Sequence, residues 1–140
     1  MSQASLAHIG YVVPRMDSAL RRFEREGGVI RIPPTFDPVQ NVWVCVLTME
    51  DGADIELVAP SAEGPSPLKG RLARGGGLDH LCYAVPDLKV AVDLEVSRGG
   101  VVVCPPCFAV ALQAQVAFVL RRSGLLVEFM LVEEAAADAR

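Results

Sequence analysis

The stretch Leu6-Ala-His8-Ile-Gly-Tyr11-Val-Val13-Pro14 returns 72 residues later as Leu78-Asp-His80-Leu-Cys-Tyr83-Ala-Val85-Pro86. The correspondence continues without a gap, so that 15 of the 51 pairs formed from residues 6–56 and their counterparts are identical. Self-similarity at one fixed offset is the signature of a repeated structural unit. The sequence therefore predicts two copies of one module.

The repeat carries two chemically informative residues with it. The chain has only two histidines, His8 and His80, and each is followed 48 residues later by a glutamate, Glu56 or Glu128, in an apolar segment. Either histidine alone is best explained as a hydrogen-bonded core residue, and Glu56 alone as the outward residue of an edge strand. Glu128 lies in Leu-Leu-Val-Glu-Phe-Met-Leu, where burial of an unpaired carboxylate would be costly. The repeated set of four favours a shared metal site over these separate explanations.

Hydrophobic patterning and turn residues predict the order strand, helix and three strands in each module. Gly27-Gly28 and Gly99-Gly100 end the two helices, and Pro33-Pro34 is expected to stop the strand that follows the first helix. Asp17 is a candidate helix cap. The expected strands are 7–13, 29–32, 42–48 and 54–59, then 78–85, 101–104, 115–120 and 125–132, and the expected helices are 18–26, 67–73 and 88–97.

We expect one domain over residues 1–140, with module one at about 5–60, a linker at 61–77 and module two at about 78–134. The linker is rich in Gly, Pro and Ser. The two modules can pair within one chain or exchange between two chains. The predicted fold class is α+β, with two tandem βαβββ modules.

Composition narrows the function classes. Apolar residues make up 51% of the chain, which indicates an apolar pocket or a buried interface, and we expect a homodimer. The net charge of −4, without a run of Lys or Arg, argues against nucleic-acid binding. No uninterrupted apolar stretch reaches the length of a membrane span, and we expect a cytoplasmic protein.

Strand periodicity gives the four residues a common chemistry. Residues two apart in a strand share a face, so His8 on the first strand and Glu56 on the last can point into one concavity. His80 and Glu128 repeat this arrangement. Two imidazoles and two carboxylates suit one divalent ion, which would be Zn, Ni, Co, Mn or Fe. Open coordination positions would allow the ion to polarise a small-molecule substrate.

The arrangement resembles the vicinal oxygen chelate superfamily, which includes glyoxalases, methylmalonyl-CoA epimerases, ring-cleaving dioxygenases and antibiotic-resistance proteins. The elements that carry the resemblance span residues 6–132 and are Ala-His8-Ile-Gly-Tyr-Val-Val-Pro, Asp-Ile-Glu56-Leu-Val-Ala-Pro, Gly-Leu-Asp-His80-Leu-Cys-Tyr-Ala-Val and Gly-Leu-Leu-Val-Glu128-Phe. The resemblance implies an open, metal-centred, β-barrel-like sheet. It also implies that His8, Glu56, His80 and Glu128 bind the metal.

Within that superfamily, a complete His, Glu, His, Glu set is similar to glyoxalases and epimerases. The segment Pro-Ser66-Pro67-Leu68-Lys-Gly-Arg-Leu72 is similar to the corresponding segment of methylmalonyl-CoA epimerases. The resemblance implies a metal-dependent epimerase that stabilises the enolate of a small acyl thioester, with Glu128 as the catalytic base and Glu56 as its counterpart. The alternatives are a lactoylglutathione lyase-like glyoxalase and a non-catalytic binding or resistance protein.

Several features depart from the epimerase pattern or stand outside it. Val44 lies about where some epimerases carry a glutamate base, and an apolar loop over 108–114 replaces a glycine-rich one. This loop is expected to close over a different substrate or to pack a dimer. Arg121 and Arg122 are candidates for binding an anion, although a solvated hairpin turn is the favoured interpretation. Trp43 is expected to be a pocket or interface wall, and Cys104 and Cys107 are expected to be structural, with oxidation of the pair as the alternative.

Overall fold

The computed structural model describes residues 4–133, which form two compact units. One unit contains residues 8–79 together with 110–112, and the other contains residues 4–7, 80–109 and 113–133. The end predicted for module two, at residue 134, lies outside the described residues. The prediction that the chain is one domain stays a prediction.

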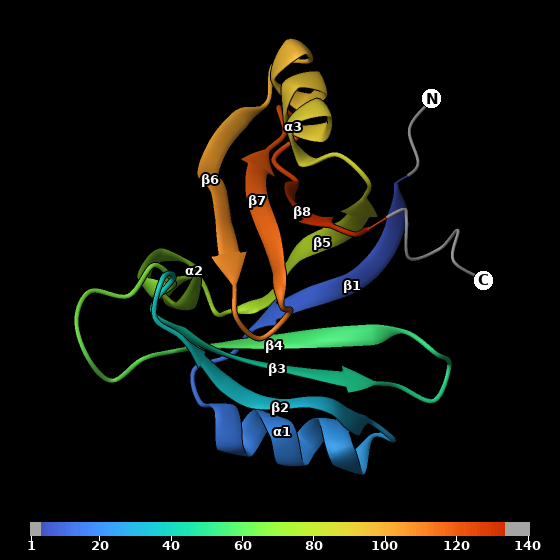
Figure 1. The fold of residues 1–140 in the computed structure, drawn as a ribbon. Coiled ribbons are helices and arrows are strands. Elements are labelled where there is room, and N and C mark those ends of the chain that lie inside the picture. The colour runs from blue at the N-terminus through green and yellow to red at the C-terminus, as the bar shows by residue number, and fades with distance from the viewer. Residues whose placement is uncertain (1–3, 134–140) are drawn as a thin grey trace. The chain divides into compact units, whose positions relative to one another are not determined.

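The first module has the order strand, helix and three strands (Figure 1). Its strands pair in the order β2-β3-β4-β1, with β1 parallel to β4 and the other neighbours antiparallel. The elements are β1 (Ser5–Val12), α1 (Met16–Arg25), β2 (Val29–Asp37), β3 (Val42–Thr48) and β4 (Asp54–Pro60), and α2 (Lys69–Ala73) follows them.

The second module repeats this topology with the order β5-β8-β7-β6, in which β5 is parallel to β8. Its elements are β5 (Gly77–Val85), α3 (Leu88–Ser97), β6 (Val101–Ala109), β7 (Ala114–Leu120) and β8 (Leu126–Leu131). The α+β class and the two tandem βαβββ modules are therefore confirmed.

Each module buries an apolar core between its helix and one face of its sheet. In the first module, α1 lies along the sheet (Figure 1), and its Leu20 and Phe23 pack on Cys45, Leu47 and other residues of the sheet. In the second module, Leu88 and Val92 of α3 pack on residues of β7 and β8. Burial of one such aliphatic or aromatic side chain contributes about 1.5–3 kcal/mol to folding. The helices therefore cover one face of each sheet, and the residues at alternate strand positions point to the other face.

The strands after both helices are longer than predicted. Pro33-Pro34 was expected to end the first of them at Ile32, but β2 continues to Asp37, and β6 likewise continues past Pro105-Pro106 to Ala109. Both strands lie at an end of the strand order, where one side of the strand has no ladder partner within residues 4–133, and proline is tolerated in such edge strands.

The helix starts agree with the sequence in one module and differ in the other. Asp87 caps α3, because its carboxylate accepts a hydrogen bond from the Val90 amide at 3.0 Å. Asp17 was expected to cap α1, but α1 begins at Met16 and Asp17 lies in its first turn. A hydrogen bond from Arg15, together with one from the Ser18 amide, lowers the pKa of the Asp17 carboxyl. The acidic group still favours the helix, since it lies near the positive end of the helix dipole.

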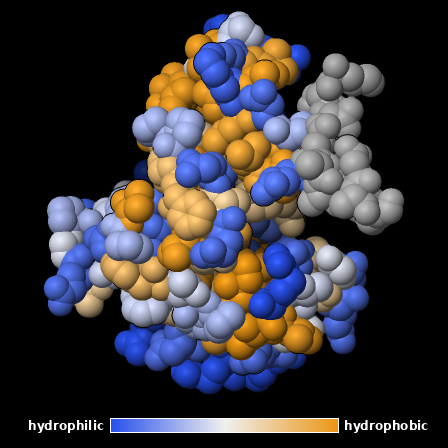
Figure 2. All heavy atoms as spheres, viewed as in Figure 1, coloured by the Kyte–Doolittle hydropathy of each residue, from blue (hydrophilic) through white to orange (hydrophobic). Residues whose placement is uncertain are grey.

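Part of the high apolar content reaches the surface. Val101 and Val103 of β6 and Leu94 and Val96 of α3 are exposed, and Figure 2 shows hydrophobic surface in the region of these two elements. The predicted homodimer stays a prediction. Within residues 4–133, no helix is long and apolar enough to cross a membrane.

Candidate metal centre

In the first module, a histidine and a glutamate meet on the sheet face opposite α1. The parallel register of β1 and β4 places Gly10 beside Glu56, and His8 lies two residues before Gly10 on the same face. The His8 Nε2 atom is 3.4 Å from Glu56 Oε1. Both residues are buried, with relative exposures of 3% and 4%.

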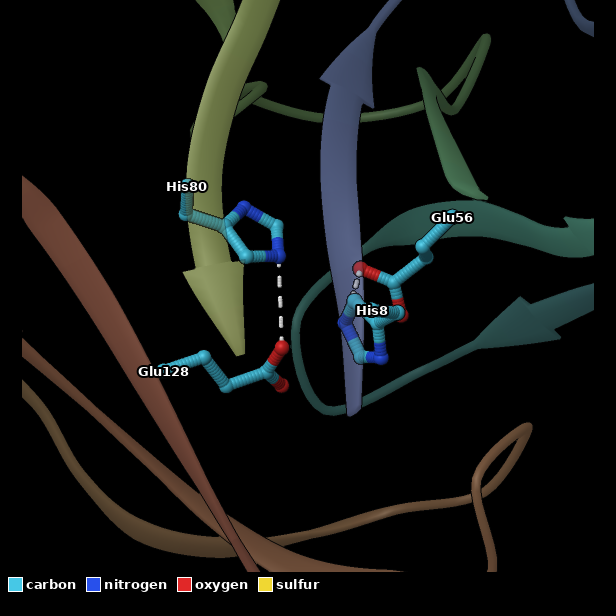
Figure 3. A group of neighbouring side chains, drawn as sticks. All are labelled: His8, Glu56, His80 and Glu128. Carbon is cyan, nitrogen blue, oxygen red and sulfur yellow. Dashed lines mark ion pairs between the residues drawn. The ribbon is translucent and has the colours of Figure 1, made fainter. Parts of the chain in front are cut away.

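In the second module, the parallel strand register positions a histidine and a glutamate in the same way. Cys82 of β5 lies beside Glu128 of β8, and His80 lies two residues before Cys82. The His80 Nε2 atom is 3.2 Å from Glu128 Oε1, and these two residues are 3% and 2% exposed. Figure 3 shows each imidazole directed toward the carboxylate of its own module. The duplication thus preserves the geometry of the pair as well as its residue types.

The geometry within each pair fits two ligands of one ion. Imidazole nitrogens and carboxylate oxygens bind Zn²⁺ at about 2.0–2.2 Å in nearly tetrahedral sites, which places two ligand atoms roughly 3.4 Å apart. The observed separations of 3.4 and 3.2 Å agree with that spacing. Burial also favours a cation, because a carboxylate taken out of water needs a positive partner.

The two pairs differ in the side chain that lies beside them on the third strand. In the second module, Phe118 of β7 pairs with Glu128, and its ring meets the His80 ring edge-on with centroids 5.2 Å apart. In the first module, Val46 of β3 occupies the corresponding position beside Glu56. We did not expect Phe118 at the site from the sequence. The cross-strand register of the hairpin, once drawn, would have indicated it.

In the first module, an apolar cluster lies on the sheet face that carries His8 and Glu56, toward the other end of the strands. Val44, where some epimerases were expected to carry a base, packs there with Val12 and Val58. Leu72 and Ala111 contact this cluster as well. Of the segment expected to be an apolar loop, 108–114, Ala111 thus packs on this cluster, and position 44 has no acidic group.

Arg121 has a different role from the solvated turn residue that we expected. Its guanidinium donates two hydrogen bonds to the buried carboxylate of Glu95, at 3.0 and 2.8 Å. This pairing raises the pKa of Arg121. Arg122 and Arg98 line a cavity of about 350 Å³ beside the pair. Arg121 is therefore held by Glu95, and its side chain is only partly exposed.

Trp43 lies on the helix side of the first sheet. It is 39% exposed, and its ring centroid is 5.5 Å from that of Phe36. With Leu20 and Pro60, it lines a cavity of about 490 Å³. Its neighbours Val44 and Val46 point to the other face, so Trp43 is separated by the sheet from the His8–Glu56 pair.

A family model described as the glyoxalase/bleomycin resistance protein/dioxygenase superfamily matches residues 7–118, which is most of the chain. The chain belongs to this superfamily. The resemblance seen in the repeated motifs is therefore confirmed. Members of the glyoxalase/bleomycin resistance protein/dioxygenase superfamily share a scaffold but not one reaction, so activity has to be argued from the site.

Among relatives within the superfamily, an ethylmalonyl-CoA/methylmalonyl-CoA epimerase of Cereibacter sphaeroides is 33% identical over 97 residues, which are 68% of this chain and 71% of that protein. The methylmalonyl-CoA epimerase of Mycobacterium tuberculosis has a similar structure, with a TM-score of 0.76, 24% identity and coverage of 94% of this chain and 91% of that one. A hypothetical protein of Bacillus halodurans has a TM-score of 0.75, 26% identity and coverage of 94% and 96%. The relative from Cereibacter sphaeroides confirms the relation to epimerases, and the two structures confirm the fold.

Proposed function

We propose that this protein is a divalent-metal-dependent epimerase acting on a small acyl thioester such as methylmalonyl-CoA. The observation that carries the proposal is the duplicated, buried His–Glu pair, with nitrogen–oxygen separations of 3.4 and 3.2 Å. The 33% identical relative from Cereibacter sphaeroides supports this substrate class.

The proposal assigns both pairs to one ion. The four residues are all buried and form a group that could hold a metal ion: His8, Glu56, His80 and Glu128. Two neutral imidazoles and two carboxylates leave such a site neutral with a divalent cation, so burial no longer carries a net charge. The donor set suits Zn, Ni, Co, Mn or Fe.

When bound, the ion would supply a Lewis acid that stabilises the negative charge developing on a substrate carbonyl. The protein's own residues supply the proton transfers. Glu128 removes the proton from the carbon between the two carbonyl groups, and Glu56 serves the opposite face, so that return of a proton there inverts the centre. Both carboxylates are buried and therefore shielded from bulk water.

The apolar cluster restricts where the base can lie. Val44 of β3 is packed against Val12 and Val58, so this position of the third strand holds an apolar side chain that cannot act as a base. We place the proton transfers on the carboxylates of the two pairs. Glu56 and Glu128 would then each have both a binding and a catalytic role.

Metal stoichiometry tests the shared ion. We expect about one divalent ion per chain by elemental analysis, and we expect His8→Ala and His80→Ala each to abolish it, because either change removes a ligand of the same ion. Glu95→Gln is the control, since it changes another buried polar residue that lies outside the two pairs. Two ions per chain, or half the metal remaining in either histidine variant, would show two separate sites and refute the shared ion.

Proton exchange tests the reaction independently of stereochemistry. In D₂O, we expect the metal-loaded protein to incorporate deuterium at C-2 of methylmalonyl-CoA and to interconvert its 2R and 2S forms. Glu128→Gln is expected to lower the rate of exchange by a factor of 10²–10⁴, the usual contribution of a general base. Turnover of the hemithioacetal of methylglyoxal and glutathione, without exchange on the thioester, would identify a glyoxalase instead. Tight binding of either compound without turnover would identify a binding protein.

A further inference from the structure

Two cysteine side chains meet in β6 although a regular strand would keep them apart. Cys104 and Cys107 are three positions apart, which in an extended strand means about 10 Å along the chain and opposite faces of the sheet. Their Sγ atoms are nevertheless 3.9 Å apart. The backbone between them must therefore depart from a regular strand.

The departure is a β-bulge at Pro105-Pro106. Cys104 pairs with Phe118 and Cys107 with Val116, so β6 advances three residues while β7 advances two. An extra residue of this kind kinks a strand and redirects its side chains. The two prolines donate no backbone hydrogen bond, which suits the interrupted part of the ladder.

The first module shows that the scaffold, and not the cysteines, produces this geometry. In β2, Ile32 pairs with Val46 and Thr35 with Val44, which is the same three-for-two register around Pro33-Pro34. The burial patterns of β2 and β6 are identical along all nine residues. Ile32 and Thr35 are the counterparts of Cys104 and Cys107 at the repeat offset. The bulge therefore occurs in both modules and does not depend on the cysteines.

The pair is also accessible, in contrast to the other two cysteines. Cys104 and Cys107 are half-buried, and the prolines between them are exposed, whereas Cys45 and Cys82 have no exposed surface. A disulfide holds its sulfurs about 2.05 Å apart, so closure requires the two Sγ atoms to approach by about 2 Å. Small rotations of the two side chains about their Cα–Cβ bonds provide movement of this size.

We propose that Cys104 and Cys107 form a reversible thiol–disulfide modification site that is oxidised by low-molecular-weight disulfides such as oxidised glutathione. One cysteine thiolate attacks the glutathione disulfide, forms a mixed disulfide and releases one glutathione. The second thiolate then attacks the protein sulfur of that mixed disulfide and releases the second glutathione. The protein loses two electrons and two protons, which appear in the two glutathione thiols.

Intact-mass analysis after equilibration with reduced and oxidised glutathione tests the proposal. We expect the wild-type protein to lose the mass of two hydrogens without retaining glutathione, and peptide mapping to place the bond between Cys104 and Cys107. Cys104→Ser and Cys107→Ser should each stop at one glutathione adduct, because no second thiol is in reach. Dithiothreitol should restore the original mass.

A transplanted pair provides the matched control. Ile32→Cys and Thr35→Cys, combined with Cys104→Ile and Cys107→Thr, move the two thiols to the equivalent bulge, and circular dichroism checks that the fold is kept. We expect this folded variant to close its disulfide as well. The proposal is overturned if the wild-type protein accumulates glutathione adducts or remains reduced at ratios that oxidise the same chain in denaturant. A folded transplant that fails to close would overturn the role of the bulge.

Discussion

The Glu95–Arg121 pair predicts an unequal response to loss of its two partners. The Glu95 side chain is 8% exposed, whereas that of Arg121 is 36% exposed. When Arg121→Met removes the guanidinium, the carboxylate stays buried and loses both of its hydrogen bonds. When Glu95→Met removes the carboxylate, the guanidinium can turn toward water. Methionine retains most of the apolar length of either side chain, so packing changes little.

The magnitudes follow from these exposures. Breaking a fully buried pair from one side costs about 3–5 kcal/mol. Since Arg121 is partly solvated, we expect Arg121→Met to lower the free energy of unfolding by about 3 kcal/mol and Glu95→Met by only about 1 kcal/mol. The double variant should be more stable than Arg121→Met alone, because it leaves no buried charge without a partner.

Urea denaturation of the three variants and the wild-type protein measures these differences, with the fluorescence of Trp43 or far-ultraviolet circular dichroism as the signal. Equal losses in the two single variants, or additive losses in the double variant, would contradict the reasoning from exposure. Either result would mean that Glu95 gains water when its partner is removed.

Four further outcomes are expected. Asp37→Ala should lower the free energy of unfolding by about 2–3 kcal/mol in urea, because the buried carboxylate accepts bonds from two backbone amides and one side-chain amide; Asp37→Asn should recover part of the loss. Gly100→Ala should cost about 1–3 kcal/mol in a thermal melt, because a Cβ atom there would lie 2.8 Å from Val119 Cγ1 and 2.9 Å from the Glu95 carbonyl oxygen; an unchanged melting temperature would mean that the backbone can shift. Burial raises the pKa of the Cys45 thiol from 9.0 to about 11, so between these values the folded chain keeps a proton that the unfolded chain releases, and stability should fall as the pH rises through that window; urea titrations should show a shallower fall in Cys45→Ala. Chelation should lower the melting temperature, and added metal at a hundred times its dissociation constant should raise the free energy of unfolding by about 2.7 kcal/mol. A melting temperature that responds to neither treatment would argue against the metal site.

The modules were predictable because, after the duplication, each element occurs twice in the sequence. A strand, a helix and three strands recur at one offset, so weak signals in one copy were supported by the other. The ends of β2 and β6 were not predictable in the same way. Proline ends a central strand but not an edge strand, and which strand lies at the edge is a property of the assembled sheet.

For the site, the sequence identified His8, Glu56, His80 and Glu128 but not the side chains around them. The register of β1 with β4 and of β5 with β8, which brings each histidine to its glutamate, depends on parallel pairing across about fifty residues. Phe118 was missed for a different reason: its place beside Glu128 follows from the register of the β7–β8 hairpin, which the predicted strand ranges do not specify.

The partnership of Glu95 with Arg121 joins a helix to a strand end 26 residues away. The local sequence around either residue does not indicate the other as its partner. Long-range pairs of this kind become visible only when the elements are packed.

The paired prolines of β2 and β6 have a consequence for self-association. These are the strands at the two ends of the strand order, the places where a further chain would add a strand to a sheet. Pro33-Pro34 and Pro105-Pro106 withdraw two successive backbone donors and bend the edge, so an incoming strand finds an interrupted template. In a chain in which half of the residues are apolar, this interruption opposes edge-to-edge aggregation, because a sheet continued from one copy into the next would have to pass the paired prolines.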